Sequence, residues 1–497
     1  MVSSTKKKQG VEGNGMMREA LVQAVQTLWD EHVSKSPPTN TVDQLDEHLK
    51  LRSALVYIQN IHSQLSKTDS LICGENQRSK GSIDRFVQWC KDHGVEVKNL
   101  RLTKFPQELG LGLVANKKIN EGEIVVEVPR KAMLSLDQAR RSPFLKKAFE
   151  RDLLLQQMDN VGLAISVCCQ RLAGDSMWKP YLDVLPSTFS CPVYYTVEQL
   201  KELKPSPLFE EALLLFRNVV RQFAYFLLQI AKNDEFDKNK KNSVAPPIFY
   251  NTPLSVDTFT FSLYRWAMCC VSTRINMIPS DQLKLSNGQP KMIPALIPML
   301  DMANHRSITN FNQESVVFCG ETDFAQIVTP ANLEPTEQLF IFYGRRTNSD
   351  FLLYNGFIPD ENQKNYDAYR LKLGINKNEK HYNARVDRFV QLGFSGAAQS
   401  NIFVFDLRTG SQSFDEKLLE FVQILIAEEP TDECINSEGT IVKAKKWLET
   451  RLKLLLKAYE KLGDEKKNED DGIKTAIRRL HEGEKALLES ALAKLTA

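Results

Sequence analysis

The residues best suited to chemistry lie in two short segments of this chain. Residues 295–305 (ALIPMLDMANH) form an apolar run that stops at the pair Asn304-His305, where a protein core would prefer no polar side chain. Residues 337–344 (EQLFIFYG) have the pattern of a buried strand that delivers the hydroxyl of Tyr343 to its end. These candidates include no carboxylate dyad. They favour a site that orients a reacting group over one that depends on strong acid–base chemistry.

A glycine-containing segment precedes both of them. Residues 108–113 (ELGLGL) place Gly110 and Gly112 between apolar strand residues, and glycines there allow a ligand to approach the backbone closely. A plain turn would explain this segment alone, just as core packing would explain a lone buried tyrosine. The order of the three segments is specific, and chance explains it poorly.

The three segments resemble the SET-domain methyltransferases, in which the last two form an active-site pseudoknot. The resemblance implies an enzyme that transfers a methyl group from S-adenosylmethionine (SAM). Such a transfer is an in-line displacement. The protein must hold an uncharged nucleophile in line with the methyl group, exclude water and surround the methyl group with oxygens.

The resemblance continues over roughly residues 75 to 495. It includes residues 216–226 (FRNVVRQFAYF), residues 272–279 (STRINMIP) and the helical C-terminal region. These features are similar to the SET-domain protein-histidine N-methyltransferases that act on actin, which carry a C-terminal domain of the Rubisco-methyltransferase type. The resemblance implies that SAM is held by Arg78, Leu109, Gly110, Leu111, Arg274, Asp301, Met302, Ala303, Asn304, His305, Asn355, Gly356 and Phe357.

The same resemblance assigns the substrate side of the site. Tyr343 would position the substrate ring, and Asn276 would bond the ring nitrogen that does not react. An imidazole with a pKa of about 6.5 is largely neutral near pH 7, so its other nitrogen can attack directly. Arg346 would contact the substrate peptide. Leu300 stands where the histidine enzymes have a tryptophan, and the smaller side chain leaves room for a lysine.

Two alternatives therefore stay open beside histidine methylation. One is a lysine methyltransferase of the Rubisco-methyltransferase type, and the other is a catalytically weak SET-fold protein that holds a partner. A nucleotide-binding module built on the glycine segment lacks both a phosphate-loop lysine and a GxGxxG motif.

Composition narrows the partners and the compartment. The 64 basic and 62 acidic residues give no electrostatic reason to expect nucleic acid or a membrane, and no apolar run approaches the roughly 18 residues of a membrane span. The nine cysteines contain no CxxC pair, so a metal site has little support. We expect a monomeric, cytoplasmic protein whose cysteines are reduced. The three lysines Lys6-Lys7-Lys8 allow a nuclear localisation signal as the alternative interpretation.

With 497 residues, the chain is too long for one compact core. The patterns predict an α+β protein with a helical N-terminal extension over 1–94 that begins with a disordered tail. A SET β-fold follows over 95–344, with a helical insert at about 135–270, and then an all-α domain over 345–497. Short strands are expected at 102–105, 111–115, 123–128, 315–319, 325–329 and 339–343.

Overall fold

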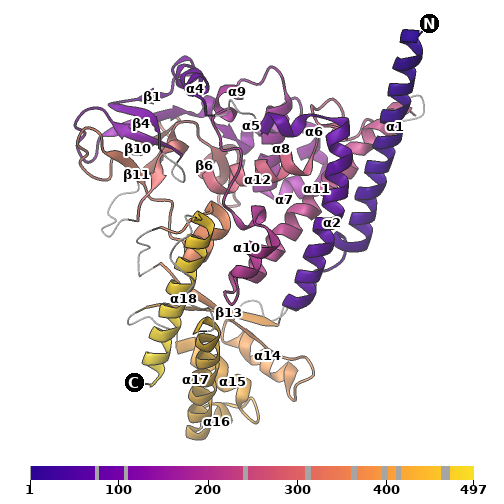
Figure 1. Ribbon diagram of the computed structural model, residues 1–497. Helices are drawn as coiled ribbons and strands as arrows, with labels where there is room; N and C mark the ends of the chain where they lie inside the picture. Colours follow the sequence, from indigo (N-terminus) through magenta and orange to yellow (C-terminus); the bar gives the residue numbers. More distant parts are fainter. Residues whose placement is uncertain are drawn as a thin grey trace. The chain divides into compact units, whose positions relative to one another are not determined.

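Figure 1 shows the computed structural model of the chain. The structure describes residues 2–72, 78–105, 110–238, 245–307, 315–359, 366–394, 401–409, 416–460 and 471–496. The chain divides into two compact units, of which unit 1 comprises Met1–Tyr195, Ala212–Tyr343 and Tyr354–Gly356. Unit 2 comprises Thr196–Glu211, Gly344–Leu353 and Phe357–Ala497.

Unit 1 begins with two long helices. Helix α1 (Val2–Leu28) continues into a π-helical turn, η1 (Trp29–Val33), and it packs against α2 (Thr41–Leu65). Helix α2 starts at Thr41 because the Asn40 side chain accepts a hydrogen bond from the amide of Asp43 at 2.9 Å. Helix α1 begins at Val2, inside the tail for which the sequence predicted disorder.

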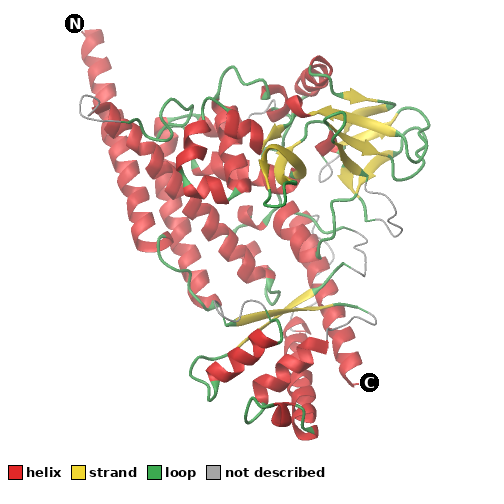
Figure 2. Cartoon of the chain, turned by 180° about the vertical axis from the view of Figure 1, so that it is seen from behind, coloured by secondary structure: helices red, strands yellow, loops and turns green. Residues whose placement is uncertain are grey.

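Three small sheets form the β part of unit 1, and Figure 2 shows their strands gathered away from α1 and α2. The first sheet has the order β2-β3-β11-β8: β2 (Leu100–Lys104), β3 (Leu111–Ala115), β11 (Gln338–Ile341) and β8 (Asn304–His305). The second has the order β1-β4-β10-β9: β1 (Glu96–Val97), β4 (Ile124–Pro129), β10 (Phe324–Val328) and β9 (Val316–Cys319). The third has the order β5-β7-β6: β5 (Leu134–Ser135), β7 (Pro290–Leu296) and β6 (Asn276–Lys284).

Helices dominate the part of the chain between β5 and β6. The long ones are α8 (Asp159–Leu172), α11 (Leu208–Lys238) and α12 (Phe261–Arg274). Unit 1 also contains α3 (Thr68–Ile72), α4 (Lys80–Asp92), η3 (Arg130–Ala132), α5 (Leu136–Arg141), α6 (Lys146–Arg151), α7 (Leu153–Gln157), α9 (Lys179–Leu182), η4 (Pro192–Tyr194) and η6 (Leu300–Met302).

Polar residues inside α11 have the partners that their burial requires. Arg217 is 3% exposed, and it donates to Glu47 Oε2 at 2.9 Å and to the carbonyl of Lys35 at 2.6 Å. Gln222 accepts a hydrogen bond from the Tyr264 hydroxyl at 2.9 Å. These bonds offset the cost of burying the polar groups in an otherwise apolar helix.

Unit 2 is mostly helical but not entirely so. The sequence indicated an all-α domain, whereas the structure adds an antiparallel pair, β12 (Tyr369–Gly374) and β13 (Ile402–Leu407). Their inward residues include Leu371 and Phe403, which pack in a core with the aromatic rings of Phe389 and Phe421. The helices of unit 2 are α10 (Val197–Glu202), α13 (Asn348–Asp350), α14 (Tyr382–Gln391), α15 (Glu416–Ile426), α16 (Asp432–Ile435), α17 (Glu438–Glu460) and α18 (Gly472–Thr496), and η7 (Phe351–Asn355) crosses from unit 2 into unit 1.

One carboxyl group is fully inside unit 2. Glu484 on α18 is 3% exposed and accepts hydrogen bonds from the hydroxyls of Ser206 at 2.7 Å and Tyr459 at 2.8 Å. Burial, with a smaller contribution from the nearby charge of Asp367, raises the pKa of Glu484 to about 8. The two hydroxyl donors oppose this rise without cancelling it.

This carboxyl group makes folding stability depend on pH. Its pKa rises from the usual 4.5 to about 8 on folding, so its stabilising contribution is complete below pH 4.5 and is lost as pH rises through 8. We expect Glu484→Gln to flatten the fall of the unfolding temperature between pH 5 and pH 8. Thermal unfolding followed by circular dichroism measures this, with Glu482→Gln, an exposed position on the same helix, as the control. An unchanged pH slope in Glu484→Gln would contradict the prediction.

Candidate functional site

The three segments found in the sequence meet in one sheet. Strand β11 pairs antiparallel with β3, so that Leu339 lies opposite Leu113. On its other side β11 pairs parallel with β8, so that Phe340 lies opposite Asn304 and Ile341 opposite His305. The strand before Tyr343 therefore lies between the glycine strand and the Asn-His pair.

Tyr343 is held at both its ring and its backbone. Its hydroxyl donates to the carbonyl of Ala303 at 2.8 Å, and its amide donates to Nδ1 of His305 at 3.2 Å. The rings of Tyr343 and His305 also contact each other, with centroids 5.1 Å apart. Because Nδ1 accepts a hydrogen bond, His305 carries no proton there, and its ring serves to position the tyrosine.

The two glycines make room for side chains of the site. A Cβ atom on Gly112 would lie 2.3 Å from Nε2 of Gln338, 2.8 Å from Cε2 of Phe105 and 3.0 Å from Nδ2 of Asn304. Gly110 has a φ of +63°, and a Cβ atom there would lie 2.6 Å from Nη1 of Arg78. A larger residue at either position would therefore displace groups of the site.

The backbone of the glycine strand also holds one of these groups. Nδ2 of Asn304 donates to the carbonyl of Leu111 at 3.2 Å, which fixes the amide of Asn304 over β3. Leu109, predicted as a backbone contact to SAM, lies outside the described residues.

Two arginines give the site its charge. Nε of Arg78 donates to the carbonyl of Val184 at 2.9 Å, and burial together with the neighbouring Arg274 lowers the pKa of Arg78 to about 10. Nη1 of Arg274 donates to the carbonyl of Asp301 at 2.8 Å. Burial lowers the pKa of Arg274, but the combined charge interactions with Asp301, Tyr181 and other neighbouring groups raise it above its usual value.

Asp301 is the one buried carboxylate in the turn between β7 and β8. Its Oδ2 accepts a hydrogen bond from Tyr181, which is fully buried on α9. Burial raises the pKa of Asp301 to about 6, against the opposing effects of Arg274 and Tyr181. Sequence reasoning missed Tyr181, because a tyrosine 120 residues away from its partner carries no local signal.

Three buried polar atoms of this region have no hydrogen-bond partner within the part of the chain that the structure describes. They are the donors Nε of Arg274 and Nε2 of Gln338 and the acceptor Oδ1 of Asp301. Buried groups of this kind cost free energy unless something bonds them. Two donors and a carboxylate acceptor suit a zwitterionic amino acid group, such as the one that SAM carries.

The chain returns to the same unit after residue 353. Nδ2 of Asn355 donates to the carbonyl of Thr273 at 3.4 Å, and the hydroxyl of Ser272 donates to the carbonyl of Tyr354 at 3.2 Å. Gly356 has a φ of +82°, and a Cβ atom there would lie 2.9 Å from the backbone of Ser190. Residues 354–356 are thereby fixed next to the end of α12, which carries Arg274.

The remaining predicted residues of the SAM and substrate sites lie in different places. Asn276, half-buried at the start of β6, donates to the carbonyl of Arg274 at 3.1 Å. Leu300, Met302 and Ala303 are buried. Arg346 and Phe357 belong to unit 2, whereas the site contacts described above lie within unit 1.

The sequence around this site matches one family of known proteins. The family model "SET domain" matches residues 110–344. These residues are thus similar to SET domains. The chain is 28% identical over 509 residues to the actin-histidine N-methyltransferases of Callithrix jacchus and Homo sapiens. Each alignment covers 97% of this chain, and it covers 78% of the first relative and 79% of the second.

Solved structures agree on the fold. The SET domain of LSMT bound to lysine and AdoHcy superimposes with a TM-score of 0.65 at 20% identity, covering 84% of this chain and 92% of that one. Rubisco LSMT bound to AdoMet superimposes with a TM-score of 0.62 at 20% identity, covering 84% and 91%. The predicted α+β fold is confirmed.

Two other kinds of feature are absent from the described residues. No helix among them is long and apolar enough to cross a membrane. Within the same ranges, no group of three or more histidine, cysteine, aspartate or glutamate side chains is placed to hold a metal ion.

The space above Gly112 gives a direct test of the site geometry. We expect Gly112→Ala to lower the free energy of unfolding by about 1–3 kcal/mol, because the new methyl group overpacks against Phe105, Gln338 and Asn304. Gly174→Ala is the control, since a methyl group added there would meet no neighbouring atom within 4 Å. Urea unfolding of both variants measures the difference. Equal stability of the two variants would show that the side chains over Gly112 are not packed as described.

Proposed function

We propose that this protein transfers a methyl group from SAM to a ring nitrogen of a histidine side chain, and that the histidine belongs to actin. The observation that carries the proposal is the seating of the Tyr343 hydroxyl on the carbonyl of Ala303, one residue before Asn304. The relatives named actin-histidine N-methyltransferase, which align with 97% of the chain, support the substrate.

The chain supplies groups that would hold SAM without using acid–base chemistry. SAM, when bound, supplies an electrophilic methyl group. Arg274 and Gln338 have buried donors available for its carboxylate, and Asp301 has a buried acceptor available for its ammonium group. Arg78 adds a second positive charge, whose lowered pKa of about 10 still leaves it charged near pH 7.

The same groups would aim the nucleophile. The hydroxyl of Tyr343 donates its proton to the carbonyl of Ala303, so its oxygen can act toward other groups only as a hydrogen-bond acceptor. The side-chain amide of Asn276 donates one proton to the carbonyl of Arg274. Its second amide proton and its oxygen can then bind an imidazole. A neutral imidazole needs no general base, and holding it in one orientation supplies much of the acceleration.

Lysine methylation is the second candidate, and Leu300 is the observation that favours it. Leu300 is fully buried in the core of unit 1, at the position where a tryptophan would shorten the pocket for a flat ring. We place histidine first because Asn276 matches an imidazole nitrogen better than an amine. Arg346 is proposed to contact the substrate peptide, and Leu109 and Phe357 to complete the SAM site.

We also propose that the protein works as a monomer in the cytoplasm. A second population in the nucleus is the alternative location. The eight cysteines within the described ranges are free thiols, which supports a reducing compartment.

A methylation assay tests the proposed function. Unmodified actin is incubated with the protein and labelled SAM, and mass spectrometry locates the label. We expect label on one histidine, its loss in an actin with that histidine changed to alanine, and a rate about 100-fold lower for Tyr343→Phe because the ring is no longer fixed on Ala303.

The other outcomes separate the alternatives. Label on a lysine would mean that the protein is a lysine methyltransferase, the alternative that Leu300 favours. Calorimetric SAM binding without label on any actin residue would contradict actin as the substrate and favour a partner-binding role.

A further inference from the structure

The chain leaves the site after Tyr343 and comes back to it at Tyr354. Tyr343 and Tyr354–Gly356 belong to unit 1, but the link segment between them, Gly344–Leu353, belongs to unit 2. Three consecutive polar residues of the link segment, Thr347, Asn348 and Ser349, are only 6%, 9% and 8% exposed. Buried polar residues are retained where hydrogen bonds hold them.

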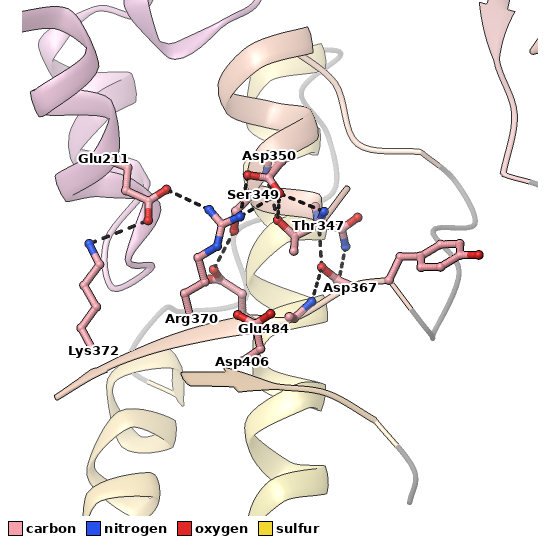
Figure 3. A network of polar contacts seen from close by, with 12 residues as sticks. Glu211, Thr347, Ser349, Asp350, Asp367, Arg370, Lys372, Asp406 and Glu484 are labelled. Carbon is pink, nitrogen blue, oxygen red and sulfur yellow. Dashed lines mark hydrogen bonds and ion pairs between the residues drawn. The ribbon is translucent and has the colours of Figure 1, made fainter. Parts of the chain in front are cut away.

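Two carboxylates from distant parts of unit 2 bind the middle of the link segment. Asp367 Oδ1 accepts from the amide of Asn348 at 2.9 Å, and its Oδ2 accepts from Nδ2 of the same residue at 2.7 Å (Figure 3). Glu484 Oε1 accepts from the Ser349 hydroxyl at 3.5 Å. Asp367 therefore binds both the backbone and the side chain of Asn348.

An arginine binds Asp350, the last residue of the short helix α13 in the link segment. Asp350 closes a capping box with Thr347, and Nη2 of Arg370 donates to its two carboxylate oxygens at 2.7 and 2.8 Å. Arg370 also reaches Glu211 Oε2 at 3.4 Å, and the charge of Asp406 acts on it as well (Figure 3). Arg370 is thus the cation that lets Asp350 lie beside several other carboxylates.

We propose that Arg370 and Asp367 are positioning residues for methyl transfer, because they fix the link segment from which Tyr343 and Asn355 extend. Tyr343 lies four residues before Thr347, and Asn355 lies five residues after Asp350. Tethers of four or five residues span at most about 14 to 18 Å and are shorter when folded, so they have little slack. The inference rests on the proposed function and adds a second group of residues on which that function depends.

Arg370→Met tests the proposal against two references. Arg370→Lys keeps the positive charge, and Arg388→Met removes an arginine–aspartate pair of the same unit that lies on α14, outside the link segment. We expect Arg370→Met to lower kcat for methyl transfer about tenfold, with less than a twofold change in KM for the protein substrate. Arg370→Lys should recover part of kcat, and Arg388→Met should leave it unchanged.

Hydrogen–deuterium exchange supplies a readout that needs no activity. In Arg370→Met, peptides covering residues 340–343 and 354–356 should exchange faster than in the unaltered protein and in Arg388→Met. Exchange and kinetics equal to those of Arg388→Met would overturn the proposal. If Arg370→Met does not fold, Asn348→Ala, which removes the 2.7 Å bond to Asp367, is measured in its place against the same expectations.

The two readouts also separate the two proposals. If the unaltered protein methylates neither histidine nor lysine but Arg370→Met still accelerates exchange at 340–343, the proposed function fails, the positioning role in methyl transfer fails with it, and only the structural effect of Arg370 on these residues is upheld. If the unaltered protein is active and Arg370→Met changes neither readout, the positioning role fails alone.

Discussion

The site depends on one strand having two different neighbours. Strand β11 lies between β3 and β8, antiparallel to one and parallel to the other. A parallel neighbour cannot come from a tight turn, so the chain must travel from Arg306 through β9 and β10 before β11 can lie beside β8. Leu339 and Ile341, at 0% and 4% exposure, hold β11 there by burial. This pairing is what places His305 beside Tyr343.

Burial of charge is the second feature that organises the site. Arg274, Arg78 and Asp301 are withdrawn from water, and within the described residues Arg274 and Asp301 each have a buried polar atom without a hydrogen-bond partner. Such an arrangement destabilises the isolated protein, and it is retained where a charged ligand completes it. The same groups leave the reacting region without a carboxylate pair, which is consistent with a nucleophile that is already neutral.

Sequence patterns were sufficient where local structure decides the outcome. Strand β3 was predicted at its observed limits because its five apolar residues follow a glycine turn, and β9, β10 and β11 were placed to within two residues. The family resemblance correctly predicted the fold. Asn304, His305 and Tyr343 lie together as that resemblance implied.

The strands and site residues that could not be predicted from the sequence depend on contacts between residues far apart in the chain, or have local sequence signals that argue against them. Strands β6 and β7 contain Pro279, Pro290 and Pro294, which argue against strand interiors. Strands β12 and β13 are short segments within helical patterns, and they pair only in the folded chain. Tyr181, Gln338 and Arg370 carry no motif, because their roles arise from neighbours that only the tertiary structure supplies.

A crystal structure with S-adenosylhomocysteine and a histidine-containing actin peptide would test the account most directly. The account predicts the amino acid end of the cofactor product bonded to Arg274, Gln338 or Asp301, and the substrate imidazole between Tyr343 and Asn276 with one nitrogen on the Asn276 amide. An imidazole that contacts neither residue, or a cofactor product bound away from Arg274 and Asp301, would contradict it.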